Sequence, residues 1–175
     1  DVTQGAIYVD GVNVKDVTQH ELRDHIGYVP QKGTLFTGTI ESNLRYAKED
    51  ATEEELAKAA EIAQALEFIE EKPERYETAI TQGGTNVSGG QRQRLSIARA
   101  LVKKPEIYIF DDTFSALDFK TDAKLRKALN ILCQETKSTV LLVAQRISSI
   151  MHAERIVVLD KGEVVGIGNH EELMK

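Results

Sequence analysis

A short apolar run that ends in two adjacent acids constrains this chain most. Ile107-Tyr-Ile-Phe-Asp-Asp112 combines large apolar residues with Asp111 and Asp112 at its carboxyl end. A run of this kind is typical of a strand buried in a parallel sheet. A carboxylate at the end of a buried strand is costly unless it meets a cation. Because open α/β sheets bind ligands at the carboxyl ends of their strands, the pattern predicts a ligand site here.

The segment Val87–Arg94 is a glycine-rich helix start. Ser88 and Gln91 have the spacing of a capping box, which accounts for those two residues. Capping does not account for Gly89 and Gly90, which leave the first helical turn bare. The free amides and the positive dipole end of a bare turn suit a phosphate group, so we predict anion binding in addition to capping.

The glycine-rich helix start strengthens the prediction of a ligand site at Asp111 and Asp112. Alone, a strand that ends in Asp-Asp is a weak signal, but after a glycine-rich turn it becomes a strong one. We therefore interpret Asp111 as an acid linked to magnesium beside a nucleotide. Its neighbour Asp112 is placed to contact a water molecule at the site.

Strands and helices alternate along the chain, which predicts an α/β domain with a largely parallel sheet. The block Thr34–Ser88 has a helical pattern instead and predicts an all-helical insertion. A tight hairpin is expected around Asp10 and Gly11. Further strands are expected at residues 26–30, 139–144, 156–159 and 164–167.

Composition excludes several classes of protein. The chain has 175 residues, with 22 Lys and Arg against 28 Asp and Glu, so its net charge of −6 argues against binding of nucleic acid. The longest apolar runs, such as Thr139–Ala144, are too short to span a bilayer. A single cysteine, Cys133, excludes an internal disulfide framework and a cysteine-based zinc site.

Taken in order, the motifs identify a family. The chain resembles the nucleotide-binding domain of an ABC transporter, and more narrowly that of a multidrug-type exporter, along essentially its whole length. The resemblance implies a P-loop NTPase-like parallel sheet core at residues 1–33 and 95–175 and a helical subdomain at 34–94. The segments similar to the Q-loop, the exporter-type segment, the signature, the Walker B strand, the D-loop and the switch segment are Val29–Gln31, Leu35–Asn43, Val87–Gln91, Ile107–Asp111, Ser115–Asp118 and Thr139–Arg146.

The resemblance implies ATP and Mg²⁺ as cofactors and assigns roles around them. Asp111 and Gln31 are expected to face the metal. Asp112, Gln145 and Gln31 are the expected catalytic residues, with Gln31 reaching the magnesium and the attacking water.

The resemblance also implies partners. In this family two nucleotide-binding domains pack head to tail, so the signature and the D-loop meet the ATP of the partner domain. The expected partners are a second, non-identical nucleotide-binding domain and the transmembrane domain of the same transporter, at the cytoplasmic face of the cell membrane. The residues expected to serve that shared site are Ser88, Gly89, Gly90, Gln91 and Asp118.

Three departures from the family pattern shape the functional hypothesis. No G-x-x-x-x-G-K-[ST] motif occurs, so we expect a domain cut after its P-loop, which by itself binds ATP weakly or not at all and is inactive. Asp112 replaces the usual glutamate and Gln145 replaces the switch histidine. Glutamine can hydrogen-bond a phosphate but cannot take up or return a proton. Together these changes resemble the degenerate half of a heterodimeric exporter.

Two other functions stay open at this point. One is an ATP-occluding regulatory or binding module with little turnover. The other is a related ATPase head of the DNA-repair or chromosome type. The second is disfavoured because no coiled-coil insertion separates Gln31 from Ser88 and because the chain is acidic.

Overall fold

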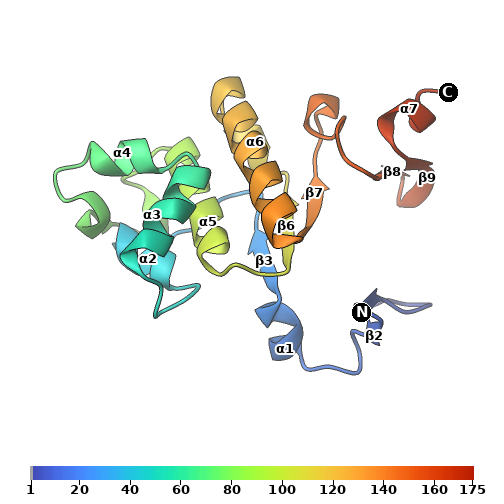
Figure 1. Cartoon of the computed structure of the whole chain (residues 1–175), viewed down its shortest axis with the longest axis horizontal. Helices are drawn as coiled ribbons and strands as arrows, with labels where there is room; N and C mark the ends of the chain where they lie inside the picture. The colour runs from blue at the N-terminus through green and yellow to red at the C-terminus, as the bar shows by residue number, and fades with distance from the viewer. Residues whose placement is uncertain (1) are drawn as a thin grey trace.

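A three-stranded parallel sheet lies near the middle of the molecule in the computed structural model, which describes residues 2–175 (Figure 1). Its strand order is β3 (Ile26–Val29), β6 (Ile107–Asp111) and β7 (Thr139–Val143). Both pairings are parallel, and the register sets Asp111 beside Val143 at the carboxyl edge. The parallel sheet expected from the sequence is confirmed, and its carboxyl edge presents the acid pair.

Two long helices bury one face of this sheet. Helix α5 (Gly89–Val102) packs on β3, and α6 (Phe119–Thr136) adds Leu125 and Leu129 to the same core. Tyr108 and Phe110 point from β6 into that core and are 1% and 0% exposed. The opposite face stays open at the neighbouring strands, where Tyr28 and Leu141 are each 54% exposed. Helix packing on one face therefore fixes β6 and aims its last residues at the edge.

The block between β3 and α5 is mainly helical and forms the green and cyan part of Figure 1. Its helices share the core of the sheet domain, because α2 and α3 both pack against α5. One short antiparallel pair, β4 with β5, accompanies the helices and buries Ile80 at 2% exposure. The elements of this block are α2 (Ile40–Arg45), α3 (Glu53–Ile62), α4 (Leu66–Glu70), β4 (Gly38–Thr39) and β5 (Ala79–Ile80).

The ends of the described chain form smaller units. The expected hairpin is confirmed: Asp10 and Gly11 have φ angles of 48° and 79°, which a tight two-residue turn requires. Strands β8 and β9 pair antiparallel with each other. None of the helices in residues 2–175 is long and apolar enough to cross a membrane. The elements are β1 (Tyr8–Val9), β2 (Val12–Asn13), α1 (Gln19–Asp24), β8 (Ile156–Asp160), β9 (Glu163–Gly168) and α7 (His170–Leu173).

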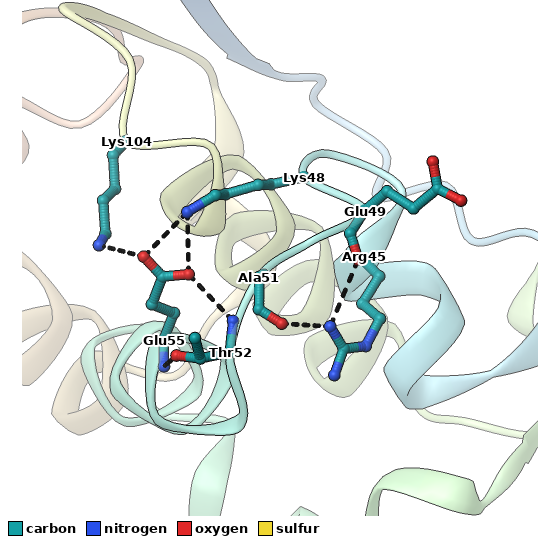
Figure 2. A network of polar contacts seen from close by, with 7 residues as sticks. All are labelled: Arg45, Lys48, Glu49, Ala51, Thr52, Glu55 and Lys104. Carbon is teal, nitrogen blue, oxygen red and sulfur yellow. Dashed lines mark hydrogen bonds and ion pairs between the residues drawn. The ribbon is translucent and has the colours of Figure 1, made fainter.

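A polar network ties the start of α3 to the end of α5 (Figure 2). The Glu55 carboxylate lies 2.6 Å from Lys104 Nζ and 3.0 Å from Lys48 Nζ, and it also accepts a hydrogen bond from the Thr52 amide. Arg45 donates to the carbonyls of Glu49 and Ala51 in the same loop. The two lysines and the capping box lower the pKa of Glu55 to about 2, with the hydrogen bond from Lys104 as the largest cause. The charged form of Glu55 therefore holds the helical block to the sheet domain.

This network predicts a pH-dependent contribution to stability. The pKa of Glu55 is lowered from 4.5 to about 2, so its contribution is complete above pH 4.5 and is lost as the pH falls toward 2. We expect Glu55→Gln to lower the urea midpoint at pH 7 and the deficit to shrink below pH 4.5. The control Glu54→Gln removes the same charge from the same helical turn. An equal deficit for both variants at pH 7 would contradict the network.

Candidate functional site

Asp112 lies where β6 leaves the sheet, in a backbone conformation that few residues adopt. Its φ of 43° is in the left-handed region, and its amide donates to the Val143 carbonyl at 3.0 Å. The chain then enters the short 3₁₀ turn Thr113–Ala116, where the buried Thr113 hydroxyl donates to the Val29 carbonyl at 3.0 Å. These bonds hold the residue against both neighbouring strands and leave it 9% exposed.

The carboxylate of Asp112 accepts hydrogen bonds from two of the residues that sequence analysis named. Gln31 Nε2 and Gln145 Nε2 both donate to Asp112 Oδ2, each at 3.0 Å. Gln31 follows β3 and Gln145 follows β7, so the flanking strands deliver these amides to the central one. The three expected catalytic residues therefore lie together, and a small cavity beside Asp112 and Gln145 is also lined by Ser115 and Arg146.

Asp111, the last residue of β6, is half-buried and accepts a hydrogen bond at its Oδ2 from the Tyr28 hydroxyl at 3.0 Å. This bond raises the pKa of Tyr28 above its ordinary value. Sequence reasoning missed Tyr28; its signal is a polar hydroxyl on the strand next to the acid, on the same side of the sheet.

The oxygen groups at this edge fit a magnesium ion that is bound together with phosphates. Residues 2–175 contain no cluster of three or more His, Cys, Asp or Glu side chains suited to hold a metal alone. Mg²⁺ commonly takes one or two carboxylates and completes its shell with water and substrate phosphates. Asp111 has a second carboxylate oxygen for such an ion, and the Gln31 side chain has its carbonyl oxygen, because its amide nitrogen is bonded to Asp112.

Gln93 is a second residue that sequence reasoning missed. It lies on α5, is 2% exposed, and holds the loop that contains Gln31 at both ends. Its Oε1 accepts from the Gly33 amide at 2.7 Å, and its Nε2 donates to the Pro30 carbonyl at 3.1 Å. A side chain at position 33 would meet Ser96 at 2.8 Å, so glycine is needed for this approach. The available signal was a glutamine on the apolar face of a helix.

The glycine-rich helix start is capped as expected. Ser88 Oγ accepts from the Gln91 amide at 3.2 Å, and Gln91 Oε1 accepts from the Ser88 amide at 3.1 Å. This reciprocal pair confirms the capping box and leaves the amides of Gly89 and Gly90 for an outside acceptor. A Cβ at Gly89 would have no neighbour closer than 4.0 Å, so the fold itself does not require glycine there.

Asp118 caps the next helix. Its carboxylate accepts from the Thr121 hydroxyl at 2.7 Å and from the Thr121 amide at 3.0 Å, and these bonds lower the pKa of Asp118. The segment before it lies close to the signature helix, because a Cβ at Gly90 would stand 3.7 Å from the Ala116 carbonyl. The structure therefore forms two groups: Gln31, Asp111, Asp112 and Gln145 at the sheet edge, and Ser88–Gln91 with the Asp118 turn beside the start of α5.

Comparison with known proteins decides the family. The family model described as "ABC transporter" matches residues 1–115. The chain belongs to the ABC transporter family. It is a nucleotide-binding domain, and its relatives make it homologous to ABC exporters.

Relatives of this ABC domain include a lipid flippase and a multidrug export protein. It is 47% identical over 175 residues to an ATP-dependent lipid A-core flippase of Desulfotalea psychrophila, a match that covers 100% of this chain and 30% of the flippase. It is 42% identical over 174 residues to a putative multidrug export ATP-binding/permease protein of Staphylococcus aureus, covering 99% of this chain and 30% of that protein. The ABC domain thus spans about a third of the length of these relatives.

A solved structure confirms the fold of the ABC domain. A bacterial Atm1-family ABC exporter with ATP bound superposes with a TM-score of 0.94 at 36% identity. The match covers 99% of this chain and 30% of the exporter chain. The mixed α/β ABC ATPase fold with its parallel sheet, expected from the sequence, is therefore confirmed.

Proposed function

We propose that this domain powers an exporter by binding and hydrolysing ATP, with a slow site of its own and a signature that serves the site of a partner domain. The observation that carries the proposal is the cluster at the sheet edge, where Asp112 receives the amides of Gln31 and Gln145. Neither amide can accept the proton of an attacking water, so Asp112 is the only base in this trio.

The domain's own site is slow because its base is short and its switch residue is neutral. The carboxylate of Asp112 is fixed close to the β6 backbone by two amide donors, so it reaches less far than a glutamate would. A displacement of about 1 Å in a positioned group costs roughly a hundredfold in rate. Gln145 can still donate a hydrogen bond to a phosphate, which favours retention of ATP over its cleavage.

The remaining residues bind and orient. Magnesium, when bound with ATP, would neutralise phosphate charge beside Asp111 and Gln31. Residues 34–94 act as the helical subdomain and residues 1–33 and 95–175 as parts of the core. In that arrangement Ser88–Gln91 offers the bare turn of α5 to the partner's ATP, and Asp118 lies next to it at the same interface.

The partners are implied by this division of labour. One is a second nucleotide-binding domain, non-identical to this one, whose own acid and switch residue support turnover. Another is a transmembrane domain of the same transporter, which is supported by the flippase and permease relatives. The domain would then lie at the cytoplasmic face of the membrane, and nucleic acid is not among its partners because the chain carries a net charge of −6.

Steady-state ATP hydrolysis tests the proposal. The full-length protein is measured alone and mixed with the candidate partner subunit. We expect almost no ATP hydrolysis by the protein alone and steady turnover in the mixture. Replacing Ser88 should abolish the turnover of the mixture. Brisk hydrolysis by the full-length protein alone would show that Asp112 and Gln145 suffice for catalysis and would overturn the slow-site assignment.

The second candidate is an ATP-occluding regulatory module with little turnover in any mixture. It is favoured by the same two bonds, because Gln31 and Gln145 engage the Asp112 carboxylate as donors and neither can accept a proton. Tight ATP retention without turnover in the mixture would support this module instead.

A further inference from the structure

Gln145 lies in the segment 144–149, which follows the last residue of β7 and is outside the sheet. Strand β7 ends at Val143, and the chain continues through the exposed Gln145 into the short 3₁₀ turn Ile147–Ser149. An exposed segment outside a sheet ladder has many conformations open to it. The 3.0 Å bond from Gln145 to Asp112 therefore depends on anchors that hold this segment in place.

Two arginines provide such anchors. Arg126, on α6, donates from Nη1 to the Ser148 carbonyl at 2.8 Å. Arg146 makes a longer contact of 3.5 Å from Nη2 to the Ser115 carbonyl, and its guanidinium lies 5.3 Å from the centre of the Phe119 ring. The bond to Ser148 is the shorter of the two polar anchors and comes from a helix that is fixed in the core.

Asp122 fixes Arg126 in turn. Arg126 Nη2 donates to Asp122 Oδ2 at 2.9 Å, and Nε lies 2.8 Å from Oδ1. The second contact is an ion pair only, because neither Nε nor Oδ1 has a hydrogen-bond partner within residues 2–175. Asp122 is 2% exposed, and Arg126 is the cationic partner that such a buried carboxylate needs. The two contacts confine the guanidinium to one orientation.

We infer that the Asp122–Arg126 pair is a positioning clamp that holds the Gln145 segment so that its side chain reaches the ligand site. This inference rests on the proposed function, because it gives Gln145 a role in retaining ATP. Asp122 lies one helical turn after Asp118, so the same turn of α6 connects the Asp118 cap to the Gln145 segment.

A purely structural role is the alternative, since an ion pair four residues apart also stabilises a helix. The two roles predict different effects when the pair is weakened. A structural pair supports α6 as a whole, whereas a clamp acts on the segment beyond β7. Arg126→Lys separates them, because lysine retains the charge beside Asp122 but cannot contact Asp122 and Ser148 with a planar fork.

Hydrogen exchange of the full-length protein without nucleotide is the first arm of the test. The amides of Ser149, Ile150 and Met151 are bonded to carbonyls of the same segment. We expect Arg126→Lys to speed their exchange roughly tenfold, while the amides of β6 stay as in the wild type. Lys127→Gln, which removes an exposed charge from the same helix, is the matched control. Unchanged exchange in Arg126→Lys would overturn the clamp.

Release of labelled ATP from the full-length protein is the second arm. We expect Arg126→Lys to speed release several-fold and to have no further effect in a Gln145→Ala background, because the clamp acts through Gln145. Equal effects in both backgrounds would show a structural role only. If the wild type binds no ATP, the proposed function fails, and the exchange arm still decides whether Arg126 holds the segment.

Discussion

Replacing Gly89 with alanine is expected to leave the fold as stable as before, or up to about 1 kcal/mol more stable, while ATP turnover falls roughly a hundredfold. The stability is kept because Gly89 lies at the start of α5, where a Cβ has no neighbour closer than 4.0 Å and alanine favours helix. Turnover is expected to fall because an added methyl would hinder the close approach of a phosphate to the bare amides, and weakening one such donor costs about 10²–10³.

The measurement pairs thermal unfolding with turnover in the full-length protein and its partner mixture. Thr18→Ala is the matched control, because it removes a capping box at α1, away from the proposed site. That variant should lose about 1 kcal/mol of stability and keep its turnover. Full turnover in Gly89→Ala would contradict phosphate binding at this turn.

Introducing at positions 112 and 145 the residues that are usual in the family should raise ATP hydrolysis. The double variant Asp112→Glu and Gln145→His is expected to raise hydrolysis at the domain's own site roughly tenfold to a hundredfold, because it lengthens the base and adds a proton carrier. A histidine at position 145 also carries an N–H donor, so it can replace the hydrogen bond that Gln145 gives to Asp112.

Single-turnover hydrolysis in the partner mixture, with the partner's own base disabled, isolates this site. Asp112→Asn combined with Gln145→His serves as the control, since it adds the imidazole without a carboxylate base. Equal rates for this control and the restored variant would show that position 112 does not act as the base.

Local rules predicted the elements well. The capping box predicted at Ser88 is formed, because it depends only on residues three positions apart. The same local rule accounts for the capping boxes that the structure forms at Thr18, Thr52 and Asn169. The carboxyl-edge position of Asp111 was equally predictable, because an apolar run before an acid pair has few alternatives in an α/β fold.

Contacts between distant segments could not be read from spacing. Gln93 lies 60 and 63 residues from the two ends of the loop it holds, and Tyr28 and Asp111 are 83 apart. The pairing of β4 with β5 was also not foreseen, because each strand has two residues and too few side chains to form a pattern. The pairing of β3 with β6 brings Tyr28 to Asp111, and the packing of α5 on β3 brings Gln93 to its loop. Both arrangements depend on the whole fold.

The left-handed backbone at Asp112 has a consequence for how such a site changes over time. Aspartate adopts a φ of 43° more readily than most residues do, and glutamate lacks that advantage; here the Asp112 carboxylate is free of the backbone and accepts from Gln31 and Gln145. Replacing a glutamate by aspartate at this position therefore lowers the backbone strain, and replacing the aspartate by glutamate raises it. If the proposed function is right, a domain with aspartate at this corner would meet a small conformational barrier to acquiring the longer acid, and a slow site would tend to persist.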